Sequence, residues 1–123
     1  MDRVFFIAGA LLAGLGVAAG AFGAHALRTR LSPEFLNVFE TGVRYHLIHA
    51  LGLLSTAWAT TRWPGPATNA AGWLFLAGIF LFSGSLYGIT LSGIRPLGAI
   101  TPLGGVAFIA GWLILAWAVW RGK

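Results

Sequence analysis

Cysteine is absent from this 123-residue sequence, and its three acidic and eight basic residues make up only 9% of the chain. Without thiols the chain cannot form a disulfide, a zinc–thiolate site, an iron–sulfur cluster or a cysteine nucleophile. A soluble domain carries roughly 25% charged residues, so this chain has too few charges to cover a water-facing surface. The shortage of charge excludes a soluble globular enzyme, a disordered tail and a fibrous repeat.

Apolar residues make up 58% of the chain instead, and they form long runs. Residues 4–27, 63–94 and 96–120 carry no charge, and at about 1.5 Å per residue each run exceeds a bilayer core of about 30 Å. Residues 47–61 are short alone but continue backward through the half-polar residues 33–46. We therefore predict one all-α domain, residues 1–123, that forms a four-transmembrane-helix bundle with both termini on the same side. The helices are expected at about 3–27, 33–61, 69–92 and 102–120.

Each predicted helix starts near a residue type that favours a helix N-terminus. Asp2, Ser32 and Thr101 suit the N-cap of the first, second and fourth helices, and Thr68 or Asn69 suits that of the third. Proline follows both Ser32 and Thr101, at the first helical position, where its missing N–H needs no partner.

The basic residues stand singly between apolar runs, which is typical of anchors at a membrane and not of a nucleic-acid-binding patch. In the four-span arrangement Arg3, Arg62, Arg121 and Lys123 fall on the side of the termini, and three or four arginines fall on the other side. Because positive charge favours the cytoplasmic side, this slight excess predicts cytoplasmic termini.

Aromatic and polar residues divide the predicted bundle into two halves. Five of the six tryptophans lie toward the termini, as rings do where they meet lipid headgroups. Polar side chains able to do chemistry lie toward the other end, where four helices bring them to a similar depth. Polar groups in hydrocarbon are costly and usually face a bundle interior or a cavity. The predicted polar cluster comprises His25, Glu40, Arg44, Tyr45, His46, His49, Ser83, Ser85, Tyr87, Arg95 and Thr101.

Two interpretations of this cluster stay open. Glu40 and Arg44 are one helical turn apart in the order that favours an ion pair, and His46 and His49 are spaced so that both rings can face one ligand. The cluster either holds helices together or binds a lipid headgroup, a small polar ligand or a proton.

No metal or cofactor is expected. His25 with His46 or His49 has the chemistry of an axial haem-ligand pair, but the chain has only two glutamates, too few for a carboxylate-bridged di-iron centre. Ser83 lacks the strand–turn–helix setting of a hydrolase nucleophile. We expect no enzymatic activity.

Small residues recur at positions where helices would meet. Small side chains let backbones approach closely in lipid, where no hydrophobic effect drives helices together. One such stripe could instead serve the seam of a homo-oligomer. The glycines expected to pack helices are Gly16, Gly20, Gly84, Gly104 and Gly105.

Four segments, residues 20–25 (GAFGAH), 41–49 (TGVRYHLIH), 81–87 (LFSGSLY) and 101–106 (TPLGGV), resemble the YgdD-like family of small bacterial inner-membrane proteins of unknown function. The resemblance covers nearly the whole chain in order. It implies a four-span protein of the bacterial inner membrane, with no established reaction, cofactor or substrate and a general link to membrane integrity. His46 stands where the family often has glutamine. The better ligand candidates are then His25, Tyr45, His49, Ser83 and Tyr87.

The resulting hypothesis is a non-enzymatic membrane protein that modulates membrane integrity or a membrane partner. It would contact membrane lipids, form a homo-oligomer and bind no nucleic acid. One alternative is an oligomeric transporter or channel component that uses His25, Arg44 and His49 in a proton or anion path. A second alternative is a haem- or quinone-binding redox protein.

Overall fold

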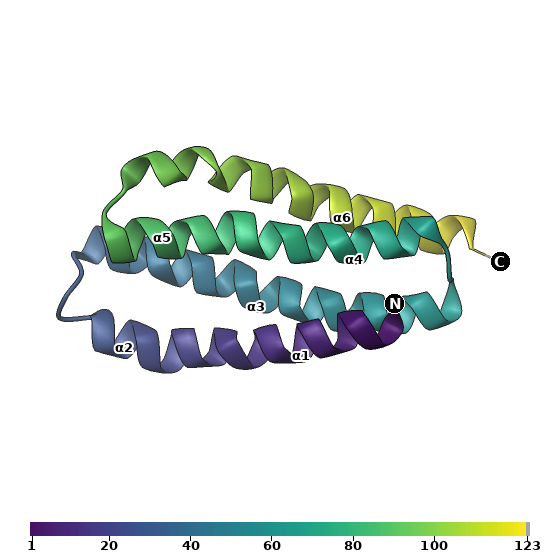
Figure 1. Cartoon of the computed structure of the whole chain (residues 1–123), viewed down its shortest axis with the longest axis horizontal. Helices are drawn as coiled ribbons and strands as arrows, with labels where there is room; N and C mark the ends of the chain where they lie inside the picture. Colours follow the sequence, from purple (N-terminus) through teal and green to yellow (C-terminus); the bar gives the residue numbers. More distant parts are fainter. Residues whose placement is uncertain (123) are drawn as a thin grey trace.

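The computed structural model describes residues 1–122; Lys123, counted above among the charges near the termini, lies outside them. Residues 1–122 form four helical rods that run side by side, with the start of α1 and the end of α6 at the same end of the molecule (Figure 1). The first and third rods each contain a π-helical turn. In chain order the elements are α1 (Asp2–Ala18), η1 (Ala19–Gly23), α2 (Ala24–Leu27), α3 (Pro33–Arg62), α4 (Pro66–Gly78), η2 (Ile79–Ser83), α5 (Gly84–Ser92), η3 (Arg95–Ala99) and α6 (Thr101–Arg121).

Of the four predicted N-caps only that of α3 is observed, and the predictions for the other three helices are wrong. The backbone N–H of Phe35 donates to Ser32 Oγ over 3.2 Å, so Ser32 caps α3 as predicted. The other three rods begin without a side-chain cap, at Met1, Gly65 and Ile100. Two of them carry proline in their first turn, where no backbone donor is lost.

The predicted four-transmembrane-helix bundle is also wrong. Among residues 1–122 three helices are long and apolar enough to cross a membrane: Asp2–Leu27, Pro66–Ser92 and Arg95–Arg121. α3 has 30 residues and sufficient length, but it is too polar along that length to qualify. Its first half carries Glu34, Glu40 and Arg44, and its second half carries a histidine and several hydroxyl side chains. The sequence prediction weighed length above polarity for this segment.

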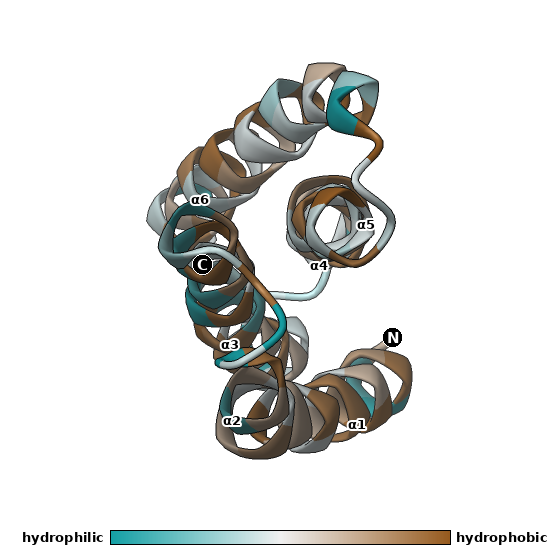
Figure 2. Ribbon diagram, turned by 90° about the vertical axis from the view of Figure 1, so that its left-hand side faces the viewer, coloured by the Kyte–Doolittle hydropathy of each residue, from teal (hydrophilic) through white to brown (hydrophobic). Residues whose placement is uncertain are grey.

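α3 nevertheless supplies much of the interior. It packs along α1 and against α4 and α5, with few contacts to α6. Seen along the rods, hydrophilic colour gathers on α3 and at rod ends, while the other rods are mostly apolar (Figure 2). The apolar core is made of Phe5, Leu53, Ala57, Phe75, Ile79 and Phe108.

Two glycines bring the first rod close to α3. A Cβ at Gly16 would lie 2.5 Å from Leu47 Cδ2, and one at Gly20 would lie 3.0 Å from Val43 Cγ1. Both contacts are within the chain, so these two glycines pack α1 and η1 on α3.

The other three glycines predicted to pack helices differ in how closely a neighbouring helix approaches them. Gly104 is buried, and a Cβ there would overlap the backbone of Phe82 in η2. Gly105 is half-buried, and its Cβ would come only within 3.9 Å of the Phe82 ring. Gly84 is exposed, and a Cβ there would meet only the Ile79 carbonyl of its own rod, at 3.9 Å.

Candidate functional site

His46 joins three rods. It lies on the buried face of α3 with only 5% of its surface exposed. Its Nε2–H donates to the Leu12 carbonyl of α1 over 2.7 Å, and its Nδ1 lies 2.8 Å from the Tyr87 hydroxyl of α5. Because a carbonyl oxygen only accepts, the Nε2 atom carries the proton, and Nδ1 of the neutral ring accepts from Tyr87.

His49 joins α3 to α6. Its Nδ1–H donates to the Tyr45 carbonyl over 2.7 Å, and its Nε2 accepts from Trp112 Nε1–H over 3.0 Å. The ring stacks on Phe108, with 3.5 Å between centroids and 8° between planes. Since an indole N–H only donates and a carbonyl only accepts, both bonds require a neutral ring with its proton on Nδ1. The two histidines therefore hold opposite tautomers.

Buried hydroxyl groups make further links between helices. Ser83, fully buried in η2, donates to the Gly42 carbonyl of α3 over 2.7 Å. Ser85 of α5 lies 2.5 Å from the hydroxyl of Thr101, the first residue of α6, and also bonds to the Phe82 carbonyl. The Ser83 bond fixes η2 against α3, and the Ser85–Thr101 bond fixes α5 against α6.

Other members of the predicted cluster lie outside this network. His25, Glu40 and Arg44 are exposed, and Tyr45 is 39% exposed with its ring against Phe82. The Arg95 guanidinium lies over a phenylalanine ring of α3, at 5.2 Å. The cluster is thus not one pocket, because its buried members pair within the protein and the rest point outward.

The interpretation of Glu40 and Arg44 as an intrachain ion pair is wrong. Within residues 1–122 the only ion pair closer than 4.0 Å joins the Met1 amino group to Asp2, at 3.7 Å. Glu40 and Arg44 have the spacing for a pair, but both are exposed on α3, where the gain from pairing barely offsets the loss of side-chain freedom.

The chemistry of the buried network is hydrogen bonding between helices. Every buried side-chain nitrogen or oxygen in residues 1–122 has a protein partner, and that part of the chain holds no group of three His, Cys, Asp or Glu residues able to bind a metal. Both nitrogens of His46 and of His49 are engaged, so neither ring offers a lone pair to an iron atom in this arrangement. The sequence reasoning missed Trp112 as a partner; its one signal was that it is the only tryptophan set away from the termini.

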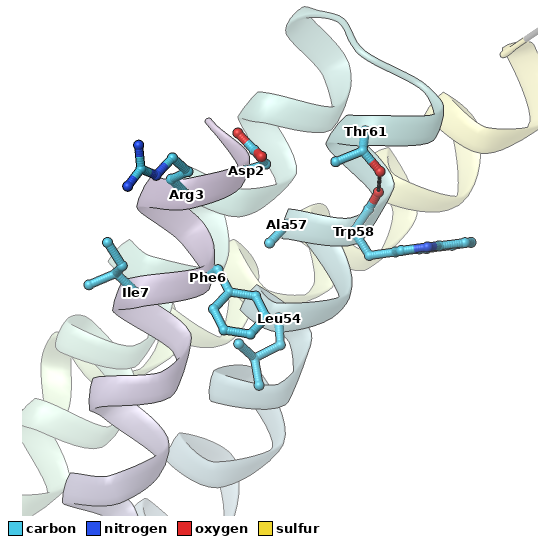
Figure 3. A pocket seen from close by; sticks show the side chains of 8 residues that line it. All are labelled: Asp2, Arg3, Phe6, Ile7, Leu54, Ala57, Trp58 and Thr61. Carbon is cyan, nitrogen blue, oxygen red and sulfur yellow. Dashed lines mark hydrogen bonds between the residues drawn. The ribbon is translucent and has the colours of Figure 1, made fainter.

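An apolar groove lies between α1 and α3 near the start of α1 (Figure 3). It has a volume of about 430 Å³. Phe6 and Leu54 point toward each other across it, and Arg3 stands at its rim (Figure 3). The residues that line the groove are Asp2, Arg3, Phe6, Ile7, Leu54, Ala57, Trp58 and Thr61.

Tryptophans surround this end of the molecule. Trp58 and Trp63 pack edge to face at 5.5 Å, and Trp73 packs against Phe5 at 5.4 Å. The Arg121 guanidinium lies 5.6 Å from the ring centroid of Trp117. Four of the five tryptophans expected near the termini are therefore placed there by their contacts.

Three apolar helices long enough to cross a membrane, packed on a polar helix, define a helical membrane protein. The chain belongs to the family described as Protein of unknown function (DUF423), which matches residues 19–105. It is 51% identical over 114 residues to the UPF0382 membrane protein YwdK of Bacillus subtilis, covering 92% of this chain and 93% of that protein.

Two staphylococcal proteins are also similar. The UPF0382 membrane protein SSP2132 of Staphylococcus saprophyticus is 49% identical, covering 92% of this chain and 93% of its own length. The UPF0382 membrane protein SAB0533 of Staphylococcus aureus is 44% identical and covers 97% of each chain. No solved structure matches. The family-level resemblance is confirmed, under the DUF423 and UPF0382 names in place of the YgdD-like one.

Proposed function

We propose that this protein is a small integral membrane protein without enzymatic activity that acts on the lipid bilayer or on a membrane partner. The observation that carries the proposal is the paired interior: the buried polar atoms of residues 1–122 all bond within the protein. A catalyst must instead present polar groups within reach of a substrate. The interior then serves to hold the helices together, and the outer surface carries the function.

The groove between α1 and α3 supplies a lipid site on that surface. Its apolar walls suit one acyl chain of a phospholipid, and Arg3 at its rim suits the phosphate. Trp58, which also lines the groove, is of the residue type found at headgroup level. This site lies at the opposite end from the predicted polar cluster, where the imidazole nitrogens already have partners.

Reversing the charge at the rim tests the lipid site. We expect protein purified in mild detergent to retain phospholipid, and Arg3→Glu to retain several-fold less, because a carboxylate repels the phosphate. Native mass spectrometry and quantitative phosphate analysis measure the bound lipid. Arg121→Glu, at the same end but outside the groove, is the control and should retain the wild-type amount. Equal lipid content in the two variants would refute the site.

A deletion strain tests the wider proposal. We expect its membrane to become more permeable to a dye that normally stays outside, and we expect the wild-type gene to reverse this while the Arg3→Glu gene does not. An unchanged membrane together with a clear defect in uptake of one solute would contradict the proposal and favour the transporter alternative.

We place the protein in the bacterial inner membrane with the start of α1 in the cytoplasm, on the basis of the positive charges at that end. The first apolar helix separates Asp2 from Arg30, so single cysteines at these positions test the orientation. In intact spheroplasts a membrane-impermeant maleimide should label Arg30→Cys and should label Asp2→Cys only after permeabilisation. The reverse pattern would invert the orientation.

A further inference from the structure

A second cavity adjoins the groove at the end of the molecule where α1 begins. It has a volume of about 360 Å³ and lies where the start of α1, the last turn of α3 and the start of α4 meet. Asp2 and Thr61 line both cavities, so the two share a wall. These residues stand at one end of the groove, and Phe6 and Leu54 lie further along it (Figure 3). We call this second cavity the polar pocket; its other lining residues are Met1, Thr60, Pro64, Gly65 and Asn69.

The side chains of the polar pocket mostly accept hydrogen bonds. The Thr60 hydroxyl donates to the Ala57 carbonyl over 2.7 Å, and the Thr61 hydroxyl donates to the Trp58 carbonyl over 2.7 Å. Because a hydroxyl has one hydrogen and two lone pairs, both oxygens can only accept from a ligand. The Asp2 carboxylate also only accepts. A ligand of this pocket must therefore bring hydrogen-bond donors.

The polar pocket also favours positive charge. Asp2 Oδ1 lies 3.7 Å from the Met1 amino group. This distance is too long for a hydrogen bond, so the carboxylate attracts an ammonium group and keeps its capacity to accept. On the other wall α3 ends at Arg62, and Pro64 has no N–H to bond the Thr60 carbonyl. The C-terminal end of a helix carries partial negative charge, which favours a cation.

The position of the polar pocket corresponds to the headgroup level of a membrane. Asp2 is the first residue of the apolar Asp2–Leu27 span, and the packed pair of Trp58 and Trp63 is of the residue type that meets headgroups. Among residues 1–122 no aromatic ring lines the pocket, whereas a quaternary ammonium group is bound by aromatic rings. The acceptors of the pocket therefore match a primary ammonium group, which has three N–H donors.

We propose that the polar pocket binds the primary ammonium group of a phospholipid whose acyl chain occupies the groove. This assignment rests on the proposed lipid site and adds the class of headgroup. Arg3 takes the phosphate, and the ammonium group donates to the Asp2 carboxylate and to the hydroxyl oxygens of Thr60 and Thr61. Asp2 and Arg3 are neighbours in the first turn of α1. Their opposite charges match a headgroup in which two carbon atoms separate phosphate and ammonium.

Matched headgroups test this assignment on the full-length protein. Dioleoyl phosphatidylcholine differs from dioleoyl phosphatidylethanolamine only in three N-methyl groups, which remove every N–H donor and keep the charge. Delipidated protein in mild detergent is mixed with both lipids at equal concentration, and native mass spectrometry measures the complexes. We expect about fivefold more bound phosphatidylethanolamine than phosphatidylcholine. Equal binding of the two, or stronger binding of dioleoyl phosphatidylglycerol, which has no ammonium group, would overturn the assignment.

Two substitutions test whether the preference arises in the polar pocket. Asp2→Asn removes the carboxylate charge, and Thr60→Val removes a hydroxyl that lines the polar pocket but not the groove. Each should lower the ratio of bound phosphatidylethanolamine to phosphatidylcholine toward one, with phosphatidylcholine binding unchanged. Glu34→Gln is the matched control, because it removes another exposed acid from the first turn of a helix, at the opposite end of the molecule. Pocket variants that are helical by far-UV circular dichroism and keep the wild-type ratio would overturn the assignment.

Arg3→Glu separates the headgroup assignment from the lipid site itself. It should lower the binding of both lipids, because the phosphate is common to them. If it does so while the wild-type protein binds both headgroups equally, the groove binds lipid and the ammonium assignment is wrong. If Arg3→Glu changes the binding of neither lipid, the lipid site is wrong and the headgroup assignment with it.

Discussion

Replacing Gly104 with valine should destabilise the protein more than most single substitutions, because it separates α6 from η2. Its Cβ would lie 2.7 Å from Phe82 Cα and would overlap the Phe82 backbone nitrogen as well. A flexible side chain could turn away, but backbone atoms inside a helix can move only if the two rods part. Overpacking of this kind costs about 3 kcal/mol. The change is measured as the shift of the unfolding midpoint in mixed micelles of rising SDS fraction, followed by circular dichroism.

The next residue along the helix provides the control. Gly105→Val makes the same chemical change in the same turn, but its Cβ would only approach the Phe82 ring to 3.9 Å. Valine has a better helix propensity than glycine, so Gly105→Val should leave the midpoint unchanged or raise it slightly. If the two variants unfold at the same SDS fraction, the close approach at Gly104 does not hold the rods together, and the packing explanation for this glycine is wrong.

The helix positions could be predicted because charge and proline interrupt the apolar runs. The first rod ends at Leu27 and α3 begins at Pro33, as expected, since arginines and the Ser32–Pro33 pair mark the connection. The third rod begins at Pro66, three residues earlier than expected. Proline fits the first turn of a helix as well as it fits a loop, and the sequence offers no signal that separates these two uses.

The polarity of α3 is also visible in the sequence, but the prediction that this helix is a fourth transmembrane span was wrong. Joining residues 33–46 to residues 47–61 correctly gave one long helix. That helix meets the length of a span but not its apolar composition. Its polar residues fall on two sides: Glu40 and Arg44 are exposed, whereas His46 and His49 lie on the opposite, buried side. Length alone does not reveal this division.

The partners in the buried network could not be predicted from spacing. Residues three apart on a helix point 60° away from each other. That angle directs His46 toward α1 and α5, while His49 faces α6. One acceptor is the Leu12 carbonyl, a backbone atom that any residue would provide, and one donor is Trp112, which belongs to an apolar run. The carbonyl has no sequence signature, and the only signal of Trp112 is its distance from the other tryptophans.

His46→Leu should have the second large effect. Leucine fills a similar volume but removes both hydrogen bonds of the imidazole. The Leu12 carbonyl retains its bond within the α1 helix, whereas the Tyr87 hydroxyl loses its partner in an apolar setting. Losing the bonds and leaving that hydroxyl unpaired costs about 3 kcal/mol. The same SDS titration measures the loss.

His46→Gln separates hydrogen bonding from every role that requires an imidazole. The glutamine amide has a donor for the Leu12 carbonyl and an acceptor for the Tyr87 hydroxyl, which matches the neutral His46 tautomer. We expect its free energy of unfolding to lie within about 1 kcal/mol of the wild-type value. We also expect it to restore the permeability barrier of the deletion strain.

Tyr87→Phe provides the thermodynamic check. If His46 acts through this hydroxyl, His46→Leu and Tyr87→Phe remove the same hydrogen bond. The double variant should then lose less free energy of unfolding than the sum of the two single losses. Additive losses would place the effect of His46 elsewhere. A His46→Leu protein of wild-type stability that fails to restore the membrane barrier would assign His46 a ligand or proton role in place of a structural one, because only such a role depends on the ring and leaves folding unchanged.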